Sequence, residues 1–169
     1  MTTIFYDGRN LHADRRQVIP TYPARYSDTA IKLFVNKENT IAYGSTGDAQ
    51  TKTDQGEIFD ALAVEFKLVY IGMLDGSMKM ETFPLPPALK DADLIAITRE
   101  KALLFRDGFR HIQTSYSGAV GTGARSLLAI HYVLGDIAKS YEINNKIDTL
   151  SSPTHMSVMA DTLNPYVVE

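Results

Sequence analysis

The sequence contains no cysteine among its 169 residues. This absence excludes a disulfide scaffold, a zinc-thiolate site and a cysteine nucleophile. With 44% hydrophobic residues, the chain is nevertheless long enough to form a compact domain with its own core. It shows no domain boundary, internal repeat or low-complexity tract, so we expect a single domain over residues 1–169.

The sequence also lacks a stripe rich in Lys and Arg, since its formal net charge is −3 and acidic and basic residues are mixed along the chain. A surface that neutralises a phosphate backbone needs clustered cations, so nucleic acid is not an expected partner. The first twenty residues have no uninterrupted apolar stretch and carry charges from Asp7 onward. This pattern fits neither a signal peptide nor a membrane anchor, and we expect a cytoplasmic protein with no membrane partner.

Close pairs of metal-binding histidines are absent as well. The four histidines are His12, His111, His131 and His155, and no two of them have a spacing such as His-x-x-x-His. We therefore expect no metal site and no other cofactor. A Ser-His-Asp triad stays open, because its members need not be neighbours in sequence, although the sequence has no Gly-x-Ser-x-Gly elbow.

Short alternating segments predict antiparallel hairpins. The expected pairs are Thr2 to Tyr6 with Leu11 to Asp14, Lys32 to Val35 with Thr40 to Tyr43, Leu94 to Thr98 with Ala102 to Phe105, and Phe109 to Thr114 with Ser117 to Gly121. A loop with Pro20 and Pro23 should separate the first two pairs, and a last strand should run from His155 to Met159.

Two regions show helical periodicity. The first begins at Thr53 or Asp54, and the second follows Gly123, breaks near Gly135 and continues from Asp136 to Ile147. Several hairpins with only two helical regions do not fit a parallel doubly wound sheet, in which strands and helices alternate. The sequence therefore favours an α+β fold with two packed antiparallel sheets and helices outside them.

Four segments carry more specific patterns: TTIFYDGRNLHADRR, IKLFVNKENTIAYGSTGDAQ, GAVGTGARSLLAIHYV and NNKIDTLSSP. The first resembles the start of mature subunits of the proteasome β-subunit and HslV peptidase family, including the shortened members common in bacteriophage genomes. The others resemble, in family order, the lysine strand with its glycine turn, the Gly-Ser-Gly turn and the Asp-x-x-Ser turn. The resemblance covers nearly the whole chain and implies a four-layer α/β/β/α sandwich of the N-terminal nucleophile hydrolase type.

By this resemblance Thr2 is a nucleophile whose α-amino group takes the proton from its hydroxyl, since a threonine hydroxyl alone is a poor nucleophile at neutral pH. An unperturbed α-amino group, with a pKa of roughly 7.7 to 8.0, suits this work. Met1 must be removed first, and the small side chain of Thr2 is of the kind that permits its removal. Taken by itself, Thr2 can equally begin an edge strand.

Lys32 and Asp14 match a charged pair of the family. The resemblance implies that the Lys32 cation favours deprotonation of the threonine and that Asp14 fixes the ammonium group. Without the family, Lys32 is equally a solvated residue that flanks a strand, and Asp14 is equally a turn residue or part of a surface ion pair. An alignment without gaps would place Thr29 at the lysine position.

Four further residues complete the implied site. Gly44 would donate its amide to an oxyanion, while Thr122, Asp148 and Ser151 would orient the terminal amine through hydrogen bonds. Thr122 stands where the family has serine, and Ser152-Pro153 follows where the family usually has two glycines. Gly44 can equally serve a strand-to-helix turn, and Asp148 and Ser151 can equally terminate a helix.

The resemblance implies a threonine peptidase that hydrolyses peptide bonds through an acyl-enzyme, with peptides or unfolded proteins as substrates. It further implies a ring or another homo-oligomer that encloses the active sites, an unfoldase ATPase as a candidate partner, and host cytoplasm as the location if a phage encodes the protein. Two alternatives stay open. One is a catalytically silent protein of this fold used for binding or assembly, and the other is an amidase of this fold that acts on a small molecule.

Overall fold

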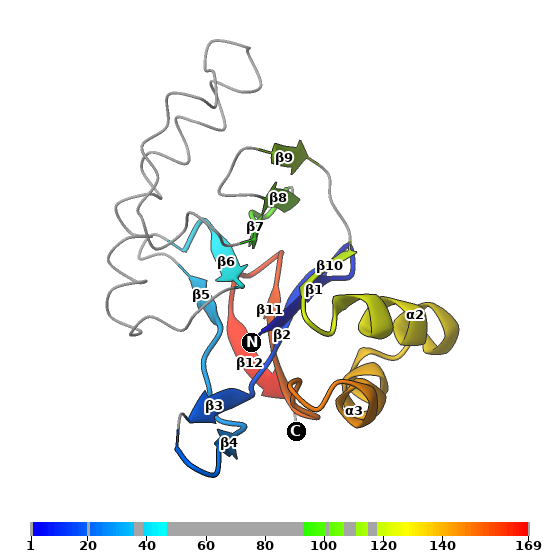
Figure 1. The fold of residues 1–169 in the computed structure, drawn as a ribbon. Coiled ribbons are helices and arrows are strands. Elements are labelled where there is room, and N and C mark those ends of the chain that lie inside the picture. Colours follow the sequence, from blue (N-terminus) through cyan, green and yellow to red (C-terminus); the bar gives the residue numbers. More distant parts are fainter. Residues whose placement is uncertain are drawn as a thin grey trace.

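The structure, a computed structural model, describes residues 2–19, 21–35, 39–46, 93–100, 102–106, 111–114 and 118–168. In chain order, its elements are β1 (Thr3–Tyr6), β2 (Asn10–Asp14), β3 (Gln17–Ile19), β4 (Arg25–Ser27), β5 (Leu33–Val35), β6 (Ala42–Ser45), β7 (Leu94–Ile97), β8 (Ala102–Arg106), β9 (His111–Thr114), β10 (Gly118–Gly121), α2 (Ala124–Leu134), α3 (Ile137–Ile147), β11 (His155–Met159) and β12 (Pro165–Val168). Figure 1 shows their arrangement.

Two antiparallel sheets of five strands form the body of the described structure. The first has the order β10-β1-β2-β11-β12, and the second has the order β5-β6-β7-β8-β9. A separate two-stranded hairpin, β3–β4, extends from the end of β2 (Figure 1). This combination of antiparallel sheets and helices agrees with the predicted α+β class.

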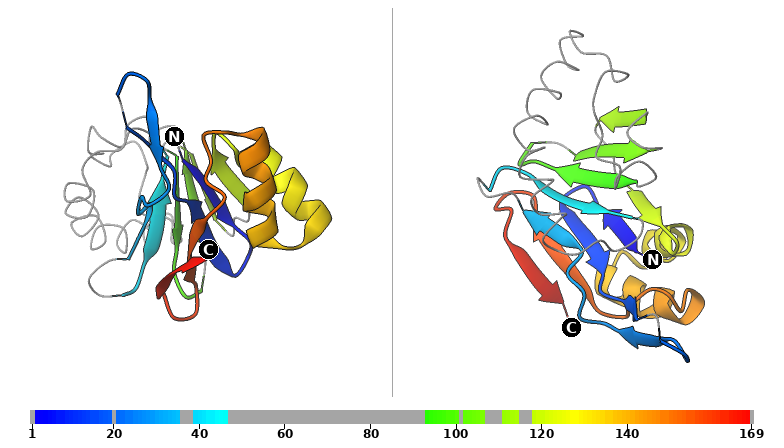
Figure 2. Two further views of the ribbon diagram at one scale, coloured as in Figure 1. Left: turned by 90° about the horizontal axis from the view of Figure 1, so that it is seen from below. Right: turned by 60° about the vertical axis from the view of Figure 1, so that its left-hand side comes forward.

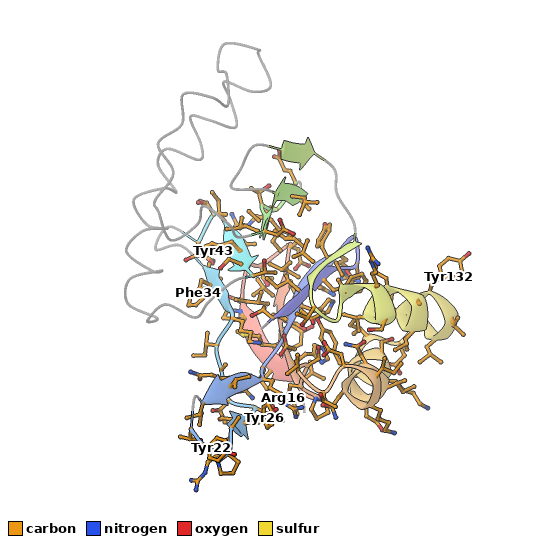
Figure 3. All side chains as sticks on the ribbon, viewed as in Figure 1. Arg16, Tyr22, Tyr26, Phe34, Tyr43 and Tyr132 are labelled. Carbon is orange, nitrogen blue, oxygen red and sulfur yellow. The ribbon has the colours of Figure 1, made fainter. Side chains whose placement is uncertain are left out.

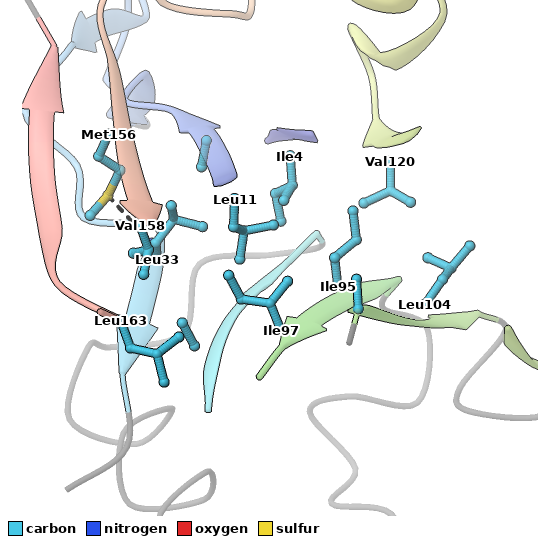
Figure 4. Packing of buried hydrophobic residues seen from close by; sticks show 13 residues of the cluster. Ile4, Leu11, Leu33, Ile95, Ile97, Leu104, Val120, Met156, Val158 and Leu163 are labelled. Carbon is cyan, nitrogen blue, oxygen red and sulfur yellow. Dashed lines mark hydrogen bonds between the residues drawn. The ribbon is translucent and has the colours of Figure 1, made fainter. Parts of the chain in front are cut away.

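The two sheets pack face to face through an apolar core (Figure 4). Ile4 and Leu11 contribute from the first sheet, and Leu33, Ile95 and Ile97 from the second, all with at most 2% of their surface exposed. Successive strand residues point to opposite faces, so each strand contributes alternate residues to this core. Burial of one such side chain contributes about 1.5–3 kcal/mol.

Helices α2 and α3 cover the other face of the first sheet (Figure 2). Phe5 of β1 packs in a second cluster with Leu127 of α2 and Tyr141 of α3. Gly135 ends α2 in the left-handed conformation with φ 65°, and the Asp136 side chain accepts the backbone N–H of Lys139 as α3 begins. The predicted break near Gly135 is therefore confirmed.

Three of the four predicted layers lie within the described residues: a helical layer and two sheets. The helix predicted to begin at Thr53 or Asp54 lies outside these residues, so the fourth layer stays a prediction. Neither described helix is long and apolar enough to cross a membrane.

One predicted hairpin is wrong. Phe109 to Thr114 and Ser117 to Gly121 were expected to pair, but β9 pairs with β8 in the second sheet, and β10 pairs with β1 in the first. Alternation along a segment specifies which side chains share a face and leaves the partner strand open. The chain instead crosses from one sheet to the other between β9 and β10.

Two further elements differ from expectation. The predicted loop with Pro20 and Pro23 contains the β3–β4 hairpin, in which Gln17 pairs with Ser27 and Ile19 with Arg25. Strand β12, which had no sequence signal, pairs with β11 at the edge of the first sheet. The first, second and third predicted hairpins and the strand from His155 to Met159 agree in their pairing with β1–β2, β5–β6, β7–β8 and β11. Strand β6, however, is displaced by two residues from the predicted Thr40 to Tyr43, so that Gly44 lies within the strand and not in the turn after it.

Candidate active site

Asp14 and Lys32 form a buried ion pair near the start of the chain. Asp14 ends β2 with no exposed side-chain surface, and Lys32 Nζ lies 2.9 Å from its Oδ2 with only 10% of the lysine side chain exposed. Asp14 Oδ1 accepts the backbone N–H of Thr3 at 2.6 Å. Thr29, the alternative to Lys32, binds the Ser27 hydroxyl at an exposed position. The structure therefore brings Lys32, and not Thr29, to Asp14.

The surroundings of Lys32 change its acidity. Burial lowers the pKa of Lys32 from its ordinary value, and the negative charge of Asp14 offsets part of this decrease. Lys32 therefore releases its proton more readily than an exposed lysine does.

The start of β5 is fixed beside β11 by Met156. The Met156 sulfur accepts the backbone N–H groups of Lys32 at 3.2 Å and of Leu33 at 3.4 Å (Figure 4).

A second polar cluster forms around the hydroxyl of Thr3. This hydroxyl lies 2.9 Å from Ser151 Oγ and accepts the backbone N–H of Gly123 at 3.1 Å. Ser151 and Thr122 both donate to Asp148 Oδ2, at 2.8 and 3.3 Å. The structure thus brings together the three residues that were predicted to orient the terminal amine, and Ser151 connects them to Thr3.

Thr2 lies one peptide unit from both polar groups, because Thr3 binds Asp14 through its backbone and Ser151 through its side chain. Only 8% of Thr2 is exposed. A Cβ added to Gly121 would overlap the Thr2 carbonyl oxygen, and Gly121 has a φ of +102° that favours glycine. The Gly-Thr-Gly turn therefore packs directly against the predicted nucleophile.

Gly44 has a packing role that the sequence did not indicate. It lies in β6 opposite Leu33, and an added Cβ would come within 2.8 Å of Leu33 Cδ2 and 2.9 Å of Ile4 Cδ1. Only glycine fits between these two side chains without displacing them. Its function as an oxyanion donor stays a prediction.

Three residues of this region were not singled out from the sequence: Thr3, Arg16 and Tyr141. Tyr141 is fully buried, and its hydroxyl donates to the Thr3 carbonyl at 3.5 Å. Burial, together with the charge of Asp14, raises the pKa of Tyr141 well above its ordinary value, which keeps it a neutral donor. The doubled threonine at the start and the doubled arginine after Asp14 were the available signals, and neither reveals a contact partner.

The structure also contains a Ser-His-Asp arrangement, the alternative that the sequence left open. His12 Nδ1 lies 2.6 Å from Ser157 Oγ, and His12 Nε2 lies 3.0 Å from Asp7 Oδ2. Partial burial alone would raise the pKa of Asp7, but hydrogen bonds from His12 and from backbone N–H groups lower it to about 2. Ser157 has no exposed surface, so a substrate cannot reach its hydroxyl. This trio connects neighbouring strands and is not a catalytic site.

The described residues around Thr3 do not form a metal centre of the usual kind. Within the part of the chain that the structure describes, no three His, Asp or Glu side chains gather in a group that could hold a metal ion. The two polar clusters consist instead of hydroxyl groups, carboxylates and one ammonium group. Such groups suit proton transfer and the stabilisation of charge.

Comparison with known proteins identifies the fold. The eukaryotic HslV from Trypanosoma brucei matches with a TM-score of 0.64 and 18% identity, over 93% of this chain and 97% of that chain. A protein described as BPH from Thiobacillus denitrificans matches with a TM-score of 0.59 and 14% identity, over 99% of this chain and 97% of that chain. No protein-family model and no curated protein matches the sequence. The identities are low while the coverage is nearly complete, so the similarity lies in the fold, and the chain has an HslV-like, proteasome-like fold.

Proposed function

We propose that the protein is an N-terminal threonine peptidase in which Thr2 is the nucleophile once Met1 has been removed. The observation that supports this function is the meeting of two polar clusters at Thr3, one that contains Lys32 and one that contains Asp148. Together they place one ammonium group, two separate carboxylates and several hydroxyl groups near the start of the chain. The HslV-like fold supports the same reaction class.

The reaction begins when the Thr2 hydroxyl attacks the carbonyl carbon of a peptide bond and passes its proton to the Thr2 α-amino group. The amine returns this proton to the leaving nitrogen as the C–N bond breaks, which leaves an ester on Thr2. Water then attacks the ester with the amine again as base, and the acid product and the hydroxyl are released. The cation of Lys32, fixed by Asp14, lowers the free energy of the developing alkoxide.

Asp148 and its two hydroxyl donors act on the amine. Ser151 and Thr122 both reach Asp148 Oδ2, and Ser151 also reaches the Thr3 hydroxyl, so the turn is fixed relative to the chain start. In this proposal these groups orient the free amine towards its own hydroxyl. Gly44 supplies an amide for the oxyanion, as the resemblance implies.

We further propose that peptides or unfolded proteins are the substrates, that the active form is a homo-oligomer, and that an unfoldase ATPase is a partner. The likeness of the fold to HslV supports these assignments. The competing function is a silent binding or assembly protein. It is favoured by two departures from the family pattern: Thr122 stands where the family has serine, and Ser152-Pro153 stands where the family usually has two glycines. As long as Met1 is attached, moreover, the Thr2 nitrogen is an amide that accepts no proton.

The intact mass of the purified protein tests the first requirement, because it shows whether Met1 has been removed. Cleavage of a peptide library then tests the reaction, and Thr2→Ala should reduce cleavage to the detection limit while the protein stays folded. Ser157→Ala is the matched control and should retain cleavage, since Ser157 lies in the buried Asp7–His12 trio. Equal cleavage by Thr2→Ala would refute the nucleophile. Complete retention of Met1 would favour the silent protein.

A further inference from the structure

We propose that Arg16 is a positioning residue that fixes the β3–β4 hairpin and the Asp148–Ser151 turn to the Asp14–Lys32 pair. Its effect on catalysis depends on the proposed function, but its effect on the turn does not. Arg16 itself touches no group that reacts. Its side chain is only 15% exposed although it lies in the connection between β2 and β3.

On one side Arg16 binds the hairpin region. Its Nε and Nη2 each donate to one carboxylate oxygen of Asp28 at 2.8 Å, which is the two-point geometry that a guanidinium and a carboxylate form best. The guanidinium carbon also lies 5.5 Å from the ring centre of Tyr26 in β4 (Figure 3). Arg16 therefore restrains β4 and Asp28, the residue that follows this strand.

On the other side the same guanidinium binds the polar turn. Nη1 donates to the backbone carbonyl of Thr149 at 2.7 Å and to Asn145 Oδ1 at 2.9 Å. Thr149 lies inside the turn that Ser151 closes with its N–H to the Asp148 carbonyl at 3.0 Å. A cation at the C-terminal end of α3 also interacts favourably with the helix dipole. Arg16 therefore restrains the backbone that presents Asp148 and Ser151.

The backbone of Arg16 completes the connection. Its N–H donates to Asp14 Oδ2 at 3.0 Å, the same oxygen that Lys32 Nζ contacts. One residue thus contacts Asp14 through its main chain and the Asp148–Ser151 turn through its side chain. The distance between the two polar clusters that meet at Thr3 is consequently fixed by Arg16 as well as by Thr3.

Arg15 provides a matched control, because it is the adjacent residue and carries the same charge. Its described side-chain contact is a hydrogen bond of 3.4 Å to the Thr29 carbonyl, and its buried Nε has no partner. Arg15→Gln and Arg16→Gln therefore remove the same charge at neighbouring positions. Only the second removes the connection between the hairpin and the turn.

Hydrogen exchange of the full-length protein tests the inference without any substrate. In Arg16→Gln, the backbone amides of residues 148–151 and of Thr3 should exchange at least about tenfold faster than in the unaltered protein, and in Arg15→Gln they should not. Arg16→Lys should stay as fast as Arg16→Gln, because one ammonium group cannot contact Asp28 and the turn together. Unchanged exchange in Arg16→Gln, or full recovery in Arg16→Lys, would overturn the proposal.

A kinetic measurement adds a second readout if the unaltered protein cleaves peptides. Arg16→Gln should lower kcat by about tenfold or more with KM within about twofold, because a displaced nucleophile and amine react less often in the bound complex. A rise in KM alone would contradict a positioning role. Absence of cleavage in the unaltered protein would refute the peptidase but leave the exchange result to decide on Arg16. If Arg16→Gln does not fold, Asp28→Asn removes the two-point contact and should accelerate the same amides to a smaller degree.

Discussion

The substitution Asp14→Asn tests how strongly the buried ion pair contributes to stability. Asparagine keeps nearly the same shape and an oxygen for the Thr3 N–H, but it places the Lys32 ammonium beside a neutral amide in a site where only 10% of the lysine side chain is exposed. Removal of one partner of a buried pair costs about 3–5 kcal/mol. Since domains of this kind are stable by only about 5–15 kcal/mol, the loss should be a large fraction of the total.

Urea unfolding followed by circular dichroism measures this loss, and its pH dependence identifies the cause. Burial already lowers the pKa of Lys32, whereas the negative charge of Asp14 raises it. Loss of that charge should therefore lower the pKa of Lys32 further. The unfolded chain then binds more protons than the folded one at pH values between the folded and the ordinary lysine pKa. The free energy of unfolding of Asp14→Asn should therefore increase as the pH rises from 7 to 9.5.

Two comparisons sharpen this test. Addition of Lys32→Met to Asp14→Asn should restore part of the stability, because the buried charge is removed together with its partner. The control is Glu142→Gln, which breaks the exposed pair between Glu142 and Lys146 at 3.5 Å and should cost under about 0.5 kcal/mol. A cost of Asp14→Asn as small as that of the control, or no recovery in the double variant, would refute the argument.

Two further predictions concern backbone geometry and pH. Gly121→Ala should lower the free energy of unfolding in urea by at least about 1–3 kcal/mol, because the new Cβ overlaps the Thr2 carbonyl and the positive φ disfavours alanine. Gly8→Ala is the control, since Gly8 has a similar φ but a Cβ there meets nothing within 4 Å. An equal loss in both variants would refute the effect of the overlap. Burial, with a smaller effect of His12, lowers the pKa of His155 to about 4, so the unfolded chain binds the proton more tightly and stability should fall by about 3 kcal/mol as the pH drops from 6.5 to 4. His155→Phe should flatten this slope, and an unchanged slope would show that other groups cause it.

Local sequence patterns predicted most of the described elements. The hairpin turns, the glycine that ends α2 and the aspartate that begins α3 all act within a few residues, so the sequence carries their signals directly. The same patterns failed for β9 and β10, whose partner strands are decided by which apolar faces meet in the core. Strand pairing between distant segments has no local signal.

The candidate site shows the same division. A resemblance of short segments brought Asp14, Lys32, Thr122, Asp148 and Ser151 to attention, and the structure places them in two connected clusters. The residues that were missed act through contacts between distant parts of the chain. Arg16 meets Thr149 across 133 positions, and Tyr141 meets Thr3 across 138 positions. Only the folded chain reveals such contacts.

The interior position of β1 in its sheet has a practical consequence for protein engineering. This strand lies between β10 and β2 in the first sheet, and the residue before it is 8% exposed. Thr2 itself is closely packed, so an affinity tag or fusion partner attached ahead of it has little room there. In the proposed enzyme such an attachment would also convert the Thr2 amine into an amide. Strand β12, by contrast, is at the sheet edge with Tyr166 and Val167 exposed by 40% and 46%, so a handle for purification or immobilisation belongs at that end of the chain.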